Sequence, residues 1–152
     1  MGPISITLVV LAIPTLIWLI HRENSKTKDI LNAKLLGLSE VNAKHGTSFP
    51  STQEELKTSF LLGDQRLLGN AMIFDPQKRR IALIKAPGNS LELQDFDFIQ
   101  SWKVDLYTIT KGHTGVHIAI GTNDLKSPLI HFAVSNVNAG DEWMARLNTM
   151  LA

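Results

Sequence analysis

The hydrophobic residues of this chain change their spacing along its length, and each spacing predicts a different kind of element. The first stretch, MGPISITLVVLAIPTLIWLIHRENSKTK, begins with an apolar run, and the 19 residues from Gly2 to Ile20 carry no charge. At about 1.5 Å per residue a helix of this length reaches roughly 28 Å, close to the thickness of a bilayer's hydrocarbon core. Residues 1–21 are therefore predicted to form a transmembrane helix.

The residues that flank this apolar run predict its orientation. Trp18 has a ring that favours the headgroup zone, and Arg22, Lys26 and Lys28 follow it. Nothing before His21 is basic except the amino terminus, which argues against a cleaved signal peptide. Because short basic flanks stay in the cytoplasm, we expect a single-pass protein of the cytoplasmic (inner) membrane, with its N-terminus outside and its C-terminal domain inside.

A helical spacing follows in residues 22–46. Apolar residues recur there at intervals of three and four, among them Leu31, Leu35 and Leu38. This stripe suits a stalk that continues the membrane helix, a helix lying on the bilayer, or a helix packed on the domain, and we expect the stalk. The segment HGTSFPS breaks the pattern, which places a boundary near residue 46 and a domain at 47–152.

Extended segments dominate after residue 70. NAMIFDPQKRRIALI has the pattern of strand, tight turn and strand, and LELQDF, FIQSWKVDLYTI, GVHIAIG and SPLIHFAV continue the series. Such a series predicts an antiparallel sheet curled into a barrel or sandwich, while residues 57–62 stay open between helix and strand. Alternate positions of the last two strands are predicted core: Val116, Ile118, Ile120, Ile130, Phe132 and Val134.

The last segment, VNAGDEWMARLNTMLA, predicts one amphipathic helix. Asn138 or Asp141 is expected to cap it, because short polar side chains accept hydrogen bonds from the first free N–H groups. Its apolar stripe is expected to close the open end of the curled sheet, and consists of Trp143, Leu147, Met150 and Leu151.

Composition limits the classes of function. Lys and Arg number 15 against 14 Asp and Glu, so no broad basic face for nucleic acid is indicated, and the lack of cysteine excludes disulfides and thiolate chemistry. The motifs GxSxG, GxxxxGK[ST], GxGxxG and HExxH are missing, and the carboxylate pair Asp95 and Asp97 has no accompanying nucleophile. The chain is thus predicted to be no enzyme, with no cofactor and no small-molecule substrate.

Three basic residues, Lys78, Arg79 and Arg80, follow the DPQ turn. They are candidates for contact with an anionic lipid or an acidic partner. A solubilising turn is the alternative, because adjacent strand residues point to opposite faces.

The histidines do not predict a metal site. His113 and His117 have helical ligand spacing, but on a strand residues four apart are separated by roughly 13 Å, too far for one ion. We expect them and His131 to be surface residues.

The segment DFDFIQSWKVDLY is predicted to direct its even positions, from Phe96 to Leu106, into the core. Ile99 then points outward, together with Lys103, Asp105 and Tyr107. The last three are the candidates for a partner-binding face.

The run AMIFDPQKRRIALI, followed by DFDFIQSWKVD, resembles a group of small bacterial membrane-anchored proteins with pleckstrin-homology-like (PH-like) domains, over residues 56–152. The resemblance implies a mainly β (α+β) fold, a PH-like antiparallel curled sheet or barrel closed by one C-terminal helix. It also implies a binding or scaffolding module without enzymatic activity.

Together these patterns predict a non-enzymatic adaptor or scaffold, held in the bilayer and binding a protein partner or a second copy of itself. The alternative is a structural subunit of a larger membrane complex, such as a secretion, pilus-like or phage-defence assembly.

Overall fold

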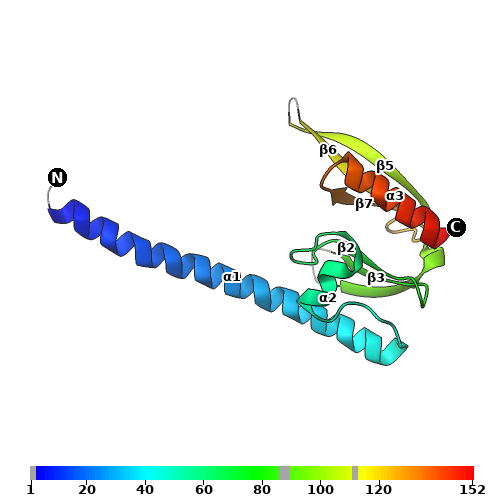
Figure 1. Cartoon of the computed structure of the whole chain (residues 1–152), viewed down its shortest axis with the longest axis horizontal. Coiled ribbons are helices and arrows are strands. Elements are labelled where there is room, and N and C mark those ends of the chain that lie inside the picture. Colours follow the sequence, from blue (N-terminus) through cyan, green and yellow to red (C-terminus); the bar gives the residue numbers. More distant parts are fainter. Residues whose placement is uncertain (1–2, 86–89, 111–112) are drawn as a thin grey trace.

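The computed structural model describes residues 3–85, 90–110 and 113–152, and their side chains except those of 3–12, 108–110, 113 and 114 (Figure 1). Three helices, seven strands and a short 3-10 helix follow one another along the described chain. In order they are α1 (Pro3–His45), α2 (Gln53–Thr58), β1 (Phe60–Gly63), β2 (Ala71–Asp75), β3 (Arg80–Lys85), β4 (Ser90–Asp95), η1 (Phe96–Phe98), β5 (Ile99–Thr110), β6 (His113–Thr122), β7 (Leu129–Val134) and α3 (Val137–Leu151).

The strands form two antiparallel sheets. One has the order β1-β2-β3-β4 and the other β5-β6-β7, so sequence neighbours are also neighbours in space. The short helix η1 separates the sheets along the chain, and its Phe96 and Phe98 are both buried. The strands predicted from sequence are thus confirmed, and residues 57–62 divide between the end of α2 and the start of β1.

The two central strands of the four-stranded sheet, β2 and β3, are buried on both faces. Alternate residues of β2 and β3, such as Met72 and Leu83, pack in one hydrophobic cluster with the three-stranded sheet and α3. The intervening residues, such as Ile73 and Ala82, pack in a second cluster with α1. Burial on both faces accounts for the continuous apolar runs AMIF and IALI, since neither face of these strands meets water.

Helix α1 has two parts with different surroundings. Leu31, Leu35 and Leu38 are buried in the second cluster, whereas the N-terminal part projects away from the sheets (Figure 1). The helix ends at His45, and Gly46 follows with a φ of +69°, a conformation that favours glycine. The stripe of residues 22–46 therefore packs on the domain along its second half.

The predicted fold class is wrong in two respects. The two sheets do not close into a barrel, because in the described chain β1–β4 and β5–β7 are hydrogen-bonded only within their own sheets. Helix α3 packs on the three-stranded sheet, and its Trp143 ring contacts Phe74 of the four-stranded sheet in the shared core. Across the described residues, no helix combines the length and the apolar character needed to cross a membrane. The predicted transmembrane segment, 1–21, also falls largely on residues 1–12, which lie outside the described side chains. The described fold is α+β.

The predicted core of the last two strands is confirmed. Val116, Ile118, Ile120 and Phe132 are buried, and Ile130 and Val134 pack against the same cluster. The stripe of α3 is confirmed as well, through the buried Trp143 and Leu147 and the partly buried Met150 and Leu151.

The predicted cap of α3 is wrong. Asn136 caps this helix, and its side-chain oxygen accepts a hydrogen bond from Ala139 N at 2.8 Å. The helix starts earlier than expected because Asn136, shortly after β7, has both the extended backbone and the side-chain oxygen that a cap requires.

Candidate functional site

The projecting part of α1 exposes large apolar side chains in every direction. Ile13, Leu16, Ile17, Trp18, Leu19 and Ile20 are all 45–61% exposed. Because successive helical residues are about 100° apart, the consecutive residues 16–20 encircle the helix and leave it no polar face. Among the described side chains, no other element exposes as many large apolar residues.

Basic residues follow this apolar surface along the helix, as the sequence indicates. The guanidinium of Arg22 lies 5.5 Å from the centre of the Trp18 ring, a distance that permits a cation–π contact. Lys26 and Lys28 are exposed one and two turns further on. The four residues predicted for a membrane interface therefore lie on one continuous helix, outside the packed core.

The three residues of the predicted basic cluster have different surroundings. Lys78 is exposed in the turn between β2 and β3. The guanidinium of Arg79 lies 4.9 Å from the centre of the Phe96 ring and donates to the Met150 carbonyl oxygen at 3.4 Å. Arg80 lies at the start of β3, where its Nε is 3.2 Å from Asp95 Oδ1. The structure does not bring the three charges together on one surface.

The predicted partner face is brought together on the three-stranded sheet. Lys103, Asp105 and Tyr107 lie on the face of β5 opposite the core, while Trp102 and Val104 pack against the core cluster. The predicted alternation fails at the two ends. Ile99 is buried beside η1, and Leu106 is 64% exposed near the end of the strand.

Two histidines of the neighbouring strands join this face. The His117 and His131 ring centres are 4.4 Å apart, and Tyr107 stacks on His117 at 4.8 Å. His113 lies on the same strand as His117, but its side chain is outside those described. The spacing of histidines within one strand does not predict this contact, because it is made between two strands.

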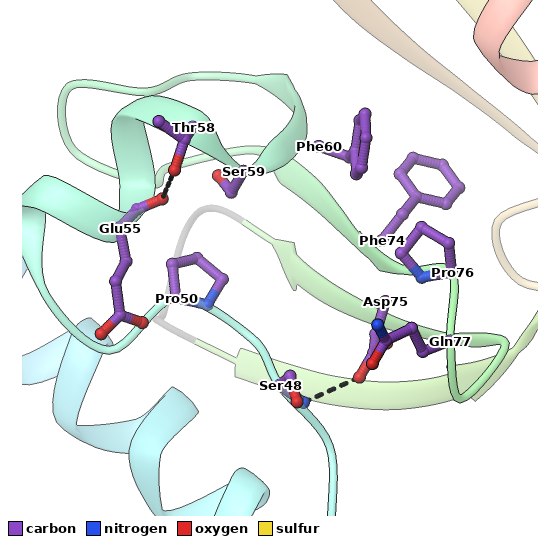
Figure 2. A pocket seen from close by; sticks show the side chains of 10 residues that line it. All are labelled: Ser48, Pro50, Glu55, Thr58, Ser59, Phe60, Phe74, Asp75, Pro76 and Gln77. Atoms are coloured by element: carbon purple, nitrogen blue, oxygen red, sulfur yellow. Dashed lines mark hydrogen bonds between the residues drawn. The ribbon is translucent and has the colours of Figure 1, made fainter.

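An open pocket of about 470 Å³ lies where the segment after α1 meets the turn between β2 and β3 (Figure 2). Phe60 and Phe74 form one wall, and Asp75 and Glu55 are its carboxylates. Asp75 Oδ2 accepts a hydrogen bond from Ser48 N at 2.7 Å, and Glu55 Oε2 accepts one from Ser51 N at 3.3 Å. Both carboxylates thus stabilise local backbone: Asp75 anchors the loop after α1, and Glu55 holds the residue that precedes Thr52, the N-cap of α2.

No family model, curated protein or solved structure matches this chain, so the resemblance to membrane-anchored PH-like proteins stays a prediction.

Proposed function

We propose that this protein is a non-enzymatic adaptor, held by the N-terminal part of α1 at the inner face of the cytoplasmic membrane, where its two-sheet domain binds a protein partner. The observation that carries the proposal is the exposure of the apolar residues from Ile13 to Ile20 on a helix that leaves the domain. This attachment does not require the helix to cross the bilayer.

The distribution of these residues favours lipid over a protein groove. A groove covers one stripe of a helix, whereas hydrocarbon covers it on all sides, and the residues from Leu16 to Ile20 are exposed on all sides. Removing one such side chain from water contributes roughly 1.5–3 kcal/mol, so six of them supply a strong drive toward an apolar environment.

The charges that follow support the inner face of the membrane. Arg22, Lys26 and Lys28 come after the apolar residues, where they would meet anionic headgroups. Each basic residue near such a surface is worth about 1 kcal/mol. The domain would then face the cytoplasm, with the outer face of its three-stranded sheet available to a partner.

A flotation assay tests the attachment. Full-length protein is mixed with vesicles of phosphatidylethanolamine and phosphatidylglycerol, and the floating fraction is compared with that of Ile17→Glu and Leu36→Glu. The two positions are matched, since both are 61% exposed on α1, but Leu36 lies in the part that packs on the domain. We expect Ile17→Glu to weaken partitioning at least about tenfold and Leu36→Glu to leave it nearly unchanged. Equal flotation of all three proteins would overturn the attachment.

Co-purification from native membranes tests the adaptor role. The full-length chain is compared with a chain lacking residues 1–21, and bound proteins are identified by mass. A stoichiometric partner kept by both chains supports an adaptor whose domain makes the contact. A partner kept only by the full-length chain supports the structural-subunit alternative, and the absence of any partner contradicts both roles.

A further inference from the structure

We propose that Asp105, His117 and His131 form a binding site for a divalent transition-metal ion, best suited to Zn²⁺, on the outer face of the three-stranded sheet. They are the only group of three or more candidate ligands that gathers among the described side chains. The inference is independent of the membrane attachment, because the site lies within the domain.

The register of the strands brings the three residues together. Asp105 on β5 lies directly opposite His117 on β6. His131 on β7 lies opposite Ala119, which places it diagonally from His117 on the same face. One ligand atom from each side chain lies within 4.8 Å of the others, so small side-chain rotations bring all three around one ion.

The distance between two of the ligand atoms suits a shared ion better than a hydrogen bond. His117 Nε2 lies 3.7 Å from Asp105 Oδ2, beyond the usual limit of an N–H···O hydrogen bond. Two ligands bound to a tetrahedral Zn²⁺ at about 2.0–2.1 Å are roughly 3.3 Å apart. His117 Nε2 is also buried and has no hydrogen-bond partner. A buried polar atom without a partner is costly, and a bound cation would satisfy it.

Neighbouring residues hold His117 in place. The Tyr107 ring stacks on the imidazole, with ring centres 4.8 Å apart and planes at 29°. Tyr107 reaches this position because it lies over Gly115, where a Cβ atom would be only 2.5 Å from the Tyr107 ring. The ligand is thus oriented before any ion arrives, which lowers the entropic cost of binding.

Lys103 competes with the proposed ion. Its ammonium nitrogen lies 3.4 Å from Asp105 Oδ2, and the Lys103 side chain is 67% exposed, so it can move away into solvent when a metal binds. Two imidazoles and one carboxylate leave a fourth tetrahedral position for water or for a partner's side chain. Nitrogen and oxygen donors without thiolate suit Zn²⁺ and its late first-row neighbours.

Isothermal titration calorimetry with Zn²⁺ tests the site, using the full-length protein in detergent. We expect one ion per chain, and at least about tenfold weaker binding in His117→Ala, His131→Ala and Asp105→Asn. His45→Ala is the matched control, because His45 is exposed at the end of α1, and its binding should equal that of the unmodified protein. Lys103→Ala should bind severalfold more tightly, an effect that general loss of structure would not produce.

Nuclear magnetic resonance of the unmodified protein keeps the test independent of whether the variants fold. Zn²⁺ should shift the imidazole signals of His117 and His131 and leave those of His21 and His45 in place. The proposal is overturned if Zn²⁺ shows no stoichiometric binding, if His113→Ala or His45→Ala weakens binding as much as His131→Ala, or if one ion binds two chains.

Discussion

Two glycines of this chain have opposite roles at the scale of single residues. Gly63 has a φ of +115°, and a Cβ atom there would collide with the Asn70 carbonyl oxygen. Gly37 lies within α1, where a Cβ would make an ordinary 3.6 Å contact with Leu91. We predict that Gly63→Ala destabilises the protein by at least about 2 kcal/mol and that Gly37→Ala stabilises it by about 0.5–1 kcal/mol. Urea unfolding measures both, and changes of the same sign would contradict this account.

Lys34 supports the loop between β1 and β2. Its ammonium donates to the carbonyl oxygens of Leu67 and Leu68 at 2.7 and 3.0 Å. Leu68 is fully buried with a φ of 52°, a conformation that is unusual for a leucine. We predict that Lys34→Met costs about 1–3 kcal/mol, since two carbonyls lose a charged donor. Lys44→Met, on the exposed end of the same helix, should change the free energy of unfolding by less than about 0.5 kcal/mol.

The burial of a single residue could be predicted from sequence where one regular element fixes the direction of its side chain. The alternation that places Ile118, Ile120 and Phe132 in the core needs only the period of a strand. Ile99 departs from it because the bulge between Ile99 and Ser101 interrupts the register beside η1. Leu106 departs from it because the strand runs on beyond the core that covers its inner face.

At the scale of elements, the packing of α1 on the four-stranded sheet joins the helix to the domain. Leu38 is fully buried in this contact, whereas Leu36 on the same helix is 61% exposed. We predict that Leu38→Ala costs about 2–5 kcal/mol, because it leaves a cavity between helix and sheet. Leu36→Ala should change stability by less than about 0.5 kcal/mol. Thermal unfolding followed by circular dichroism measures the difference, and equal losses would mean that α1 does not pack as described.

The elements could be predicted from sequence, but their assembly could not. Apolar runs and turn residues located the strands, whereas no local signal states that η1 separates two sheets. The stripe Leu31, Leu35 and Leu38 indicated a helix with one apolar face, and the sheet that covers this face is known only from the structure.

The proposed metal site was missed for the same reason. The ligands come from three strands, and the register between strands decides that Asp105, His117 and His131 meet. Distances within one strand can be derived from sequence, and they place His113 roughly 13 Å from His117, too far apart for one ion. The available signal was one histidine between core residues in each of β6 and β7, since His117 follows Val116 and His131 follows Ile130.

For the whole molecule, α1 has a projecting part and a packed part, which implies that membrane attachment and folding can be separated. The buried contacts of α1 begin at Leu31, so a chain that starts at residue 22 keeps all of them. We predict that the free energy of unfolding of this chain lies within about 0.5 kcal/mol of that of the full-length protein in the same detergent. We also predict that this chain no longer floats with vesicles. Loss of folding in this truncation would show that the projecting part of α1 stabilises the domain.

A chain that starts at residue 46 should behave differently, because it uncovers one face of the four-stranded sheet. Leu31, Leu35 and Leu38 are then lost from the second cluster, and each contributes roughly 1.5–3 kcal/mol through burial. Their sum approaches the roughly 5–15 kcal/mol that stabilises a typical domain, so we predict that this chain is unfolded or aggregated. Amide hydrogen exchange distinguishes the two truncations: β2 and β3 should stay protected in the chain from 22 and exchange rapidly in the chain from 46. Strong protection of both strands without α1 would mean that the helix covers the sheet without holding it together.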